Sequence, residues 1–518
     1  LARVIVRQII EAGITDVVVS PGSRNAPLSL AFFAASKRGL IKLHVRIDER
    51  TAAFFALGII KASGRPVPIV CTSGTAVANY HPAVLEASHT NAPLLVLTAD
   101  RPAILRKTGA NQTTEQARIY GKAVRYFADI DGPVFPMELP FDSLRSGPVH
   151  LNVQFDEPML PDDSDKWLDE IVISAKAFES RTKPTTLKSD ASRGVLVIGH
   201  DRGGLNIESV RKFAKELGWP IIAEDPLSFP DAVAHASIFL TSAQIRAALI
   251  PQTVIVIGRT TLSRSINTFL KLAPTQIVID PRMATVDSDR YADKRFTQIP
   301  ELNTHKASPE WLEQWEKYSL RCGKSVDGLT GFTEAVIARE IAANLPDGST
   351  LFVSSSRPIR DLEGFAAPRS GVTTHANRGL AGIDGNISTA LGIACASKQT
   401  FAVLGDLSFL HDLTGLIQRE EINCAFIVIN NDGGGIFSTL PQRGVDGFES
   451  VFGTPHGLDP AAIAAAMGIS ASTISSVDEL KKILKAPVKG VSITVANVPS
   501  RDENADSLKA IYESMNSI

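Results

Sequence analysis

Cysteine, net charge and long apolar runs are all scarce in this chain of 518 residues. The four cysteines (Cys71, Cys322, Cys395 and Cys424) form no Cys-x-x-Cys pair, and three of them lie in apolar or small-residue stretches typical of a core. This pattern fits a reducing cytoplasm. No run of about 18 apolar residues occurs, so we expect no membrane-spanning helix.

The near-absence of net charge argues against large anionic partners. The chain has 53 basic and 55 acidic residues and a formal net charge of −2, so no overall field attracts it to nucleic acid or to an anionic membrane. A small-molecule ligand is expected instead. Residues 1–10 have helical periodicity and lack the zones of a signal peptide. Because the first residue is Leu1, we expect that N-terminal residues are missing from the sequence.

Short β-branched runs alternate with amphipathic stretches along the whole chain. The runs lie at residues 16–19, 68–71, 93–97, 194–198, 252–257, 276–280 and 401–404. This alternation predicts an α/β fold in which each domain is a mostly parallel sheet flanked by helices. The length predicts three domains. A polar tract at 180–192 and a charged segment at 309–327 place them at 1–178, 179–328 and 329–518.

Two polar turns follow neighbouring predicted strands in the third domain. Gly405-Asp406-Leu407-Ser408 follows the run 401–404, and Asn431 lies in the glycine-rich turn after the run 426–429. This spacing is one βαβ step. Asp406 and Asn431 would offer hard oxygen ligands to a small divalent cation, and the glycines would let backbone amides approach a phosphate. The pair therefore predicts a metal-bridged diphosphate.

Several strand-end loops carry arginines or a helix-capping acid. Arg24 follows the first predicted strand, and Glu49 precedes an apolar helix, where an ordinary role as a solvated or capping residue is the alternative for each. Polar loops at 109–116, 258–264 and 354–361 add further polar and basic residues. Arginine grips carboxylates in a bidentate manner, so a substrate with several carboxylates would account for this set.

The segment 377–390 contains two glycine-flanked turns around Ile383 and then a helix start at Ser388. Such a segment suits a loop wrapped over a cofactor. No Gly-x-Gly-x-x-Gly follows a strand with an acid about 20 residues on, which weakens the hypothesis of a nicotinamide-dependent oxidoreductase.

Together these motifs resemble those of thiamine diphosphate (ThDP) enzymes. Within that superfamily the chain resembles the synthases of menaquinone biosynthesis that make 2-succinyl-5-enolpyruvyl-6-hydroxy-3-cyclohexene-1-carboxylate. The segments that carry the resemblance are 20–28, 48–51, 72–79, 109–112, 377–389, 405–412 and 430–437.

The resemblance implies a three-domain ThDP architecture and a defined reaction. These enzymes decarboxylate 2-oxoglutarate and add the remaining unit to isochorismate in a Stetter-like 1,4-addition. A pyrimidine-binding first domain, a central domain and a diphosphate-binding third domain are expected. ThDP with Mg²⁺ or Mn²⁺ is the implied cofactor. The cofactor would lie between the first domain of one subunit and the third domain of another, in a homodimer or a tetramer of two dimers.

The resemblance also assigns roles to individual residues. Glu49 would activate the cofactor, Ile383 would support its bent shape, and the metal ligands would be Asp406, Asn431 and the Gly433 carbonyl. The implied substrate-contacting residues are Arg24, Gln112, Arg264, Ser356, Arg360 and Arg378. The implied cofactor-binding residues are Glu49, Ser73, Gly74, Asn79, Ile383, Gly405, Asp406, Leu407, Ser408, Asn431, Gly433, Gly435 and Ile436.

Three positions depart from this family's pattern. Arg357 stands where relatives commonly have Met or Asn, and Arg264 stands where they often have Lys. The stretch 124–149 carries Pro133, Pro136, Pro140 and Pro148 and no clear amphipathic helix, where relatives have a longer helical connection. We expect either a trimmed loop there or residues missing from the sequence.

Two further hypotheses are compatible with the sequence. One is a different ThDP-dependent decarboxylase or carboligase, such as a relative of acetolactate synthase, whose substrates carry fewer carboxylates. The second is a non-catalytic ThDP-fold protein, although such a protein would be expected to lose the activating acid at position 49.

Overall fold

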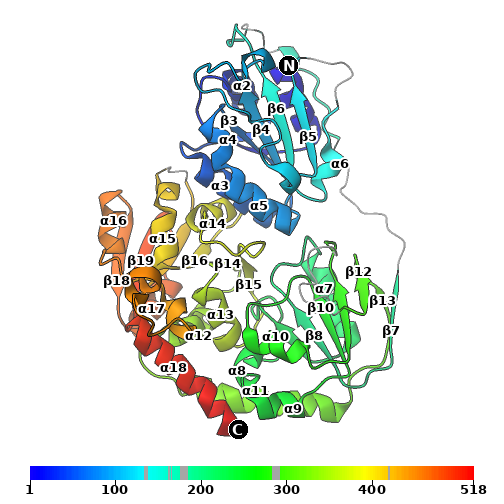
Figure 1. The fold of residues 1–518 in the computed structure, drawn as a ribbon, viewed down its shortest axis with the longest axis vertical. Coiled ribbons are helices and arrows are strands. Elements are labelled where there is room, and N and C mark those ends of the chain that lie inside the picture. The colour runs from blue at the N-terminus through cyan, green and yellow to red at the C-terminus, as the bar shows by residue number, and fades with distance from the viewer. Residues whose placement is uncertain are drawn as a thin grey trace. The chain divides into compact units, whose positions relative to one another are not determined.

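The computed structural model describes residues 1–132, 138–161, 164, 166–174, 185–282, 292–417 and 421–517. The chain forms two compact units. The first unit comprises residues 1–181, 384–397 and 411–422, and the second comprises residues 182–383, 398–410 and 423–518. Each unit contains the parallel α/β layers that the sequence predicts (Figure 1).

The first unit is built on a six-stranded parallel sheet of order β2-β1-β3-β4-β6-β5. Its strands are β1 (Asp16–Val19), β2 (Lys42–Val45), β3 (Val67–Cys71), β4 (Leu94–Asp100), β5 (Tyr126–Ile130) and β6 (Val149–Gln154). Its helices are α1 (Ala2–Glu11), α2 (Ala26–Lys37), α3 (Glu49–Ser63), α4 (Thr75–Asn79), α5 (His81–Thr90), α6 (Phe141–Leu144) and α14 (Asn386–Ala394). Because β1 to β4 are parallel, the loops that follow them emerge at one edge of the sheet.

Helix α3 is the central helix of this unit. The Asp48 side chain caps its start by accepting hydrogen bonds from the backbone N–H groups of Arg50 and Thr51, and Gly64 ends it in the left-handed region at φ 69°. Residues 51–60 are all buried. A helix that is apolar all round is expected to be covered on several faces, and α14 packs along one of them (Figure 1).

The second unit holds two further sheets of five and six strands, both parallel. The five-stranded sheet has the order β12-β11-β10-β8-β9, with β8 (Gly194–Ile198), β9 (Ile221–Ala223), β10 (Thr253–Ile257), β11 (Thr275–Ile279) and β12 (Lys294–Phe296). The six-stranded sheet has the order β15-β14-β16-β17-β19-β18, with β14 (Ser349–Val353), β15 (Val372–His375), β16 (Thr400–Gly405), β17 (Cys424–Asn430), β18 (Ser470–Ile474) and β19 (Val491–Asn497).

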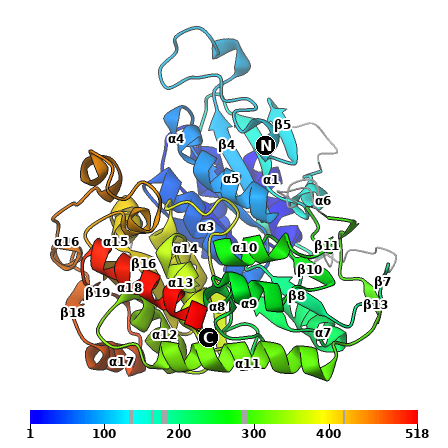
Figure 2. The same ribbon diagram turned by 60° about the horizontal axis from the view of Figure 1, so that its bottom comes forward.

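Helices cover these sheets and join them into one unit. The helices are α7 (Ile207–Leu217), α8 (Ala236–Phe239), α9 (Ala243–Ala248), α10 (Arg264–Leu270), α11 (Pro309–Asp327), α12 (Glu334–Asn344), α13 (Arg357–Phe365), α15 (Asp406–His411), α16 (Pro460–Ala466), α17 (Val477–Lys485) and α18 (Arg501–Ser514). The C-terminal helix α18, red in Figure 2, contacts α8. Its Leu508 and Ile511 belong to the same buried apolar cluster as Val195 and Ile255 of the five-stranded sheet.

Two segments that look like connections in the sequence are regular structure. The charged segment 309–327 is the helix α11, capped by Ser308 and anchored by the buried Trp311 and Trp315. Within the polar tract 180–192, β7 (Thr186–Ser189) pairs with β13 (Glu301–Thr304). Both segments are polar on one face only, which periodicity over a short window does not reveal.

The proline-rich stretch 124–149 contains β5 and the four-residue helix α6. Pro140 precedes α6, whereas Pro133 and Pro136 lie outside the described residues. Three of the four cysteines are buried and none forms a disulfide. No helix in the described part of the chain combines the length and apolar character needed to cross a membrane.

Candidate active site

The predicted metal ligands lie at the ends of two neighbouring parallel strands. β16 and β17 pair in register from Thr400 opposite Cys424 to Gly405 opposite Ile429. Asp406 follows β16 as the first residue of α15, and Asn431 follows β17. The βαβ step predicted from their spacing is confirmed. Both side chains are therefore delivered to one edge of the sheet.

Asp406 is buried, and its carboxylate is held by three hydrogen bonds. Oδ1 accepts from the Leu407 N–H at 2.7 Å, and Oδ2 accepts from the Gly433 N–H at 2.9 Å and from His456 Nε2 at 3.3 Å. Burial raises the pKa of Asp406 above its ordinary value, although these hydrogen bonds act in the opposite direction. A buried carboxylate in this position is suited to binding a cation, which would offset the cost of burying its charge.

His456 was not foreseen from the sequence. Its Nδ1 accepts a hydrogen bond from the Leu458 N–H at 3.0 Å, so Nε2 carries the proton and donates to Asp406. The loop that presents His456 is tied to Asp432, whose Oδ1 accepts from the N–H groups of His456 and Gly457. These contacts fix the direction in which Asp406 points.

Asn431 makes one side-chain hydrogen bond that also was not foreseen. Its Nδ2 donates to Oε1 of Glu334 at 2.6 Å, and its Oδ1 is buried without a hydrogen-bond partner among the described residues. A buried amide oxygen that lacks a partner is costly. It is the kind of atom that a bound cation would satisfy.

The glycines beside Asn431 leave no room for side chains. Gly433 has φ 132°, and a Cβ there would lie 2.2 Å from the Gly453 carbonyl oxygen. A Cβ at Gly435 would lie 2.4 Å from Asn431 Nδ2. Gly433 and Gly435 therefore let the backbone pass close to the ligand side chains.

The residues of this turn fit a magnesium diphosphate. The structure brings together the buried carboxylate of Asp406, the Asn431 amide oxygen, which has no partner among the described residues, and the backbone of Gly433. Carboxylate, amide and carbonyl oxygens are all hard donors of the kind that Mg²⁺ prefers. In the part of the chain that the structure describes, no three His, Cys, Asp or Glu side chains lie together as a metal cluster. A metal site here would have to use the amide and a backbone carbonyl.

An arginine-rich cavity of the second unit, with a volume of about 260 Å³, is lined by Arg264, Arg357, Arg360 and Ile436, together with one acid, Glu363. Arg264 is the first residue of α10 and Arg360 lies in α13, so the two cations come from different predicted domains. Neither makes an ion pair within the described ranges. Burial lowers the pKa of Arg360, and the nearby Arg357 and Arg378 act in the same direction. This clustering of cations favours an anionic ligand.

Ser356 has a strained backbone beside this cavity. Its φ is 75° and its ψ is −125°, a region that non-glycine residues seldom adopt, and its carbonyl oxygen accepts a hydrogen bond from Arg360 Nη1. Strain of this kind is retained where surrounding structure enforces it, often at binding sites.

Arg378 lies in a buried ion pair. Its guanidinium is 2.8 Å from Glu224, and both side chains are almost completely buried. Glu224 follows β9 and also accepts from the backbone N–H groups of His200 and Leu262. Ile383 is 39% exposed in the loop that ends at α14. Gly405 ends β16, and Leu407 and Ser408 lie in the first turn of α15.

In the first unit, Glu49 is the first residue of α3 and is partly exposed. It comes after β2, whereas Arg24 comes after β1 and the Ser73–Gly74 turn comes after β3. The parallel sheet therefore brings these residues to one edge. Burial is the main cause of the raised pKa of the nearby Cys71 thiol, and the negative charge of Glu49 raises it further.

The loop after β4 folds back onto the Ser73–Gly74 turn. Ser73 Oγ donates to the Gln112 carbonyl oxygen at 2.9 Å, and Gln112 Nε2 donates to the Ser73 carbonyl oxygen at 3.1 Å. Arg101, which was not foreseen, donates to Ser73 Oγ and to the Gln112 carbonyl oxygen. Arg24 donates to the Phe155 carbonyl oxygen at 3.0 Å. Asn79, at the end of α4, is exposed.

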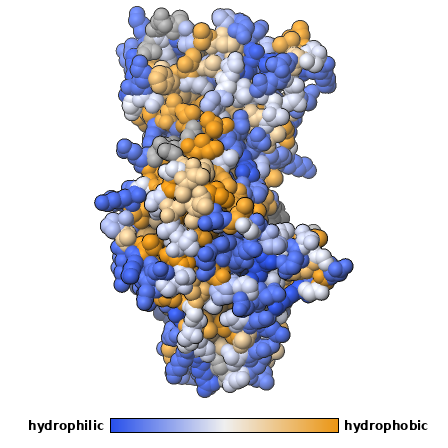
Figure 3. Space-filling view, turned by 90° about the vertical axis from the view of Figure 1, so that its left-hand side faces the viewer, coloured by the Kyte–Doolittle hydropathy of each residue, from blue (hydrophilic) through white to orange (hydrophobic). Residues whose placement is uncertain are grey.

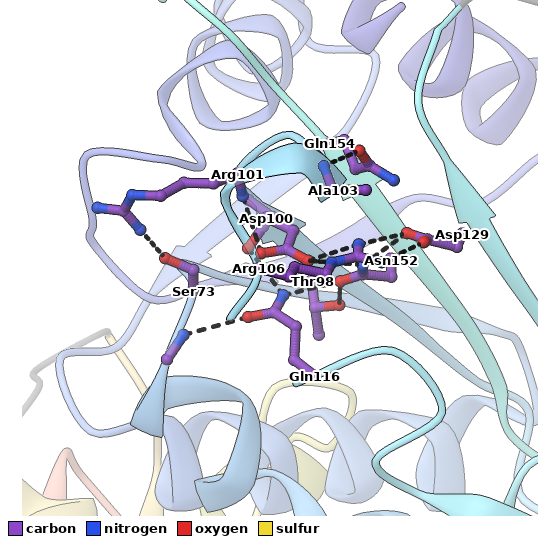
Figure 4. A network of polar contacts seen from close by, with 12 residues as sticks. Ser73, Thr98, Asp100, Arg101, Ala103, Arg106, Gln116, Asp129, Asn152 and Gln154 are labelled. Atoms are coloured by element: carbon purple, nitrogen blue, oxygen red, sulfur yellow. Dashed lines mark hydrogen bonds and ion pairs between the residues drawn. The ribbon is translucent and has the colours of Figure 1, made fainter. Parts of the chain in front are cut away.

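A polar network that is buried at Asp100, Gln116 and Asn152 holds this loop in place (Figure 4). Arg106 bridges Asp100 and Asp129, and Asn152 donates to both of these carboxylates. Gln116 donates to Asn152 and accepts from the Gly74 N–H at 3.2 Å. Burial would raise the pKa of Asp129, but the hydrogen bonds from Arg106 and Asn152 outweigh it and hold that pKa below its ordinary value.

Helix α3 and helix α14 cross with their backbones in contact. A Cβ at Gly58 would lie 2.1 Å from the Thr389 carbonyl oxygen, and a Cβ at Gly392 would lie 2.0 Å from the Phe55 carbonyl oxygen. Arg50 also donates to the His411 carbonyl oxygen at 2.7 Å. The helix that begins with Glu49 is thus packed against the helix that follows the Ile383 loop.

Comparison with protein families finds ThDP-binding domains along the chain. Residues 1–119 match the thiamine pyrophosphate enzyme N-terminal TPP binding domain, residues 161–353 match the middle domain of thiamine pyrophosphate enzymes, and residues 361–498 match the C-terminal TPP binding domain. Thiamine pyrophosphate is another name for ThDP.

Curated relatives are similar over nearly the full chain. The 2-succinyl-5-enolpyruvyl-6-hydroxy-3-cyclohexene-1-carboxylate synthase of Thermobifida fusca (strain YX) is 38% identical, over 93% of this chain and 93% of the relative. The enzyme of the same name from Nocardioides sp. (strain ATCC BAA-499 / JS614) is 39% identical, over 98% and 96%. The one from Lysinibacillus sphaericus (strain C3-41) is 34% identical, over 99% and 97%.

Among solved structures, the crystal structure of benzoylformate decarboxylase from Polynucleobacter necessarius is similar to this chain with a TM-score of 0.68. The similarity covers 96% of this chain and 98% of that one at 15% sequence identity. At that identity the likeness concerns the fold alone, and it agrees with the three parallel α/β sheets described above.

Proposed function

The chain belongs to the ThDP-dependent 2-succinyl-5-enolpyruvyl-6-hydroxy-3-cyclohexene-1-carboxylate synthases, and from this we propose that it decarboxylates 2-oxoglutarate and joins the remaining four-carbon unit to isochorismate. The products are the compound in the family name and CO₂, formed on the route to menaquinone. The observation that supports this best is the arginine-rich cavity of the second unit, which Arg264 and Arg360 line together with Ile436, a residue of the turn that follows Asn431. Both proposed substrates carry two carboxylates, and arginine is suited to gripping them.

The proposed cofactor tail binds at the ends of β16 and β17. Asp406, Asn431 and the carbonyl of Gly433 would hold Mg²⁺ or Mn²⁺, and Gly405, Leu407, Ser408, Gly435 and Ile436 would surround the diphosphate. When bound, ThDP supplies an electron sink for the negative charge left by loss of CO₂. The buried carboxylate and the unpartnered Asn431 oxygen support this assignment.

Glu49 is the proposed acid–base residue. Its carboxyl would share a proton with a ring nitrogen of the cofactor's aminopyrimidine, near the Ser73–Gly74 turn, Asn79 and the apolar support Ile383. The place of Glu49 supports this role, because the parallel sheet of the first unit brings it to the same edge as Arg24 and the Ser73–Gly74 turn. Gln112, Arg24, Ser356 and Arg378 are the remaining proposed substrate contacts. The Glu224 pair would have to open, or to orient Arg378, for that residue to reach a substrate.

We also propose that the enzyme is a cytoplasmic homodimer or dimer of dimers. Four cysteines without a disulfide suit a reducing compartment. Apolar side chains reach the surface of both units (Figure 3), among them Phe33 at 53%, Ile47 at 57% and Val451 at 65% exposure. Light scattering should give a mass that is an even multiple of the chain's. A monomeric mass at micromolar concentration would contradict the dimer.

An assay with both substrates tests the proposed reaction. Purified protein with ThDP and Mg²⁺ should release CO₂ from 2-oxoglutarate and consume isochorismate in equal amounts. The matched control is pyruvate, which has the same 2-oxo acid group without the distal carboxylate. Turnover of pyruvate alone, with isochorismate untouched, would favour a relative of acetolactate synthase and contradict the proposal.

A further inference from the structure

The amide of Asn431 is held by a carboxylate from a distant helix. Glu334 opens α12 and is 97 residues away in the sequence, yet its Oε1 accepts from Asn431 Nδ2 at 2.6 Å. Glu334 is 5% exposed. The side chain that accepts this hydrogen bond from Asn431, a proposed metal ligand, is therefore a buried acid that belongs to none of the motifs of the cofactor site.

The chemistry of this contact fixes which way the amide points. An ionised carboxylate only accepts hydrogen bonds, so the nitrogen of Asn431 must face Glu334 and the oxygen must face away. That oxygen is buried and has no partner among the described residues. Rotating the amide by half a turn would place oxygen against oxygen at Glu334 and present N–H groups where a cation would bind.

Glu334 is itself held in position. Its second oxygen accepts from Arg357 Nε at 3.3 Å, and its backbone N–H donates to Asn504 Oδ1 at 3.2 Å. Arg357 also pairs with Asp361 and lines the arginine-rich cavity. The carboxylate of Glu334 therefore lies between Arg357, which lines the arginine-rich cavity, and Asn431, the proposed metal ligand. It cannot turn without breaking its hydrogen bond to Arg357.

We propose that Glu334 is a positioning residue of the metal site, which holds the Asn431 amide with its oxygen toward the cation. The inference rests on the proposed function, because it requires Asn431 to be a metal ligand. A purely structural role is the competing explanation, since an acid in the first turn of a helix is stabilising there without any second function. Partners of metal ligands commonly set ligand orientation, and their loss costs about 10–100-fold in metal affinity.

Calorimetric titration of ThDP at a series of Mg²⁺ concentrations separates these roles. Glu334→Ala should raise the Mg²⁺ concentration that half-saturates ThDP binding by about 10–100-fold. Asn431→Asp should also weaken binding, because it sets two carboxylates against each other. The double variant Glu334→Ala/Asn431→Asp should recover most of the loss, since a carboxylate offers oxygen whichever way it turns. Asn431→Asp should thus weaken Mg²⁺-dependent ThDP binding in the wild-type protein and strengthen it in Glu334→Ala. A purely structural role of Glu334 would not produce this reversal.

A second double variant keeps the test valid if Glu334→Ala does not fold. In Glu334→Gln/Asn431→Asp the hydrogen bond is kept with donor and acceptor exchanged, so binding should require close to the wild-type Mg²⁺ concentration. Glu340→Ala is the control on the same helix: Glu340 is buried against Arg339 and Lys481, and its loss should lower thermal stability without changing the Mg²⁺ dependence.

Three results would overturn the inference: a wild-type Mg²⁺ dependence in Glu334→Ala, no recovery in its double variant, or failure of the exchanged pair to bind ThDP. Absence of Mg²⁺-dependent ThDP binding by the wild-type protein is a different result. It would contradict the proposed function itself.

Discussion

Hydrogen bonds from the fold offset only part of the cost of burying the negative charge of Asp406. Two backbone N–H groups and His456 donate to it, yet burial still leaves its pKa above the ordinary value. A divalent cation would remove this imbalance. The metal is therefore expected to matter for cofactor binding as well as for turnover.

Asp406→Ala should weaken ThDP binding in a way that depends on Mg²⁺. Without this carboxylate, one hard ligand is lost and the diphosphate charge is less neutralised. Titration of ThDP at low and high Mg²⁺ should show the larger loss at low Mg²⁺. The exposed Asp446→Ala serves as control and should bind like the wild type. An unchanged titration for Asp406→Ala would count against the metal site.

Residues of the site could be predicted from the sequence where the chemistry is local. Asp406 and Asn431 each follow a strand directly, so strand periodicity alone aligns them. Glu334 and His456 contact them from 97 and 50 residues away, through loops and helix ends whose paths depend on tertiary packing. No local pattern distinguishes Glu334 from an ordinary helix-capping acid. Arg101 directly follows β4, and its position after a strand could have pointed to it.

At the level of elements, helix α3, which begins with Glu49, crosses helix α14 with the two backbones in contact. The two helices approach at Gly58 and Gly392, where neither has a side chain to separate the backbones. Close approach of this kind has no tolerance for an added carbon, because packed interiors do not deform freely.

Gly58→Ala should destabilise the first unit. The new Cβ would lie 2.1 Å from a backbone carbonyl oxygen, so the helices must move apart. Overpacking of this kind costs about 1–3 kcal/mol in the free energy of unfolding. Gly323→Ala in α11 is the matched control, because its Cβ would meet nothing nearer than 3.8 Å and alanine favours helix. Equal melting temperatures for Gly58→Ala and wild type would contradict the tight crossing.

We expect the buried His150 in β6 to make the stability of the first unit depend on pH. Thr98 Oγ1 donates to Asn152 and so accepts from His150 Nε2 at 2.7 Å, which leaves the buried Nδ1 unprotonated and without a hydrogen-bond partner among the residues that the structure describes. Burial lowers the pKa of His150 to about 3. Below about pH 6.5 the unfolded chain binds a proton that the folded chain does not.

The free energy of unfolding should therefore fall as the pH drops from about 6.5 toward about 3, with His150 contributing up to about 1.4 kcal/mol per pH unit. Denaturant unfolding at pH 5, 6 and 7 measures this slope. His150→Gln, which can still donate to Thr98 and does not titrate, should show a smaller slope. Identical slopes in the two proteins would show that His150 does not cause the dependence.

Strands that are short β-branched runs could be predicted, and β1, β3, β4, β8, β10, β11, β16 and β17 lie where the sequence places them. The other strands of the described residues were not placed from the sequence, β5 and β7 among them. β5 precedes a proline-rich stretch, and β7 is a four-residue strand in a polar tract with only Leu187 buried. Their pairing with β6 and β13 depends on partners distant in sequence.

For the whole molecule, the two units have complementary proposed tasks. The first unit carries Glu49, Arg24 and Gln112 at one edge of its sheet, and the second carries the Asp406–Asn431 turn and the arginine-rich cavity. The family resemblance, with its cofactor lying between first and third domains, could be stated from motifs alone. The sharing of those domains between two copies is likewise implied by the resemblance alone, because no local sequence pattern encodes a subunit interface.

The proposed mechanism requires that Glu49 act on the same ThDP molecule whose diphosphate is held by Asp406 and Asn431. Hydrogen–deuterium exchange at the thiazolium C2 of bound ThDP, followed by quenched-flow NMR without substrate, measures this action directly. We expect rapid exchange in the wild type and, in Glu49→Gln with ThDP fully bound, a rate lower by about 10²–10⁴-fold, the usual contribution of a positioned acid or base. Equal exchange rates in wild type and Glu49→Gln would refute this role of Glu49.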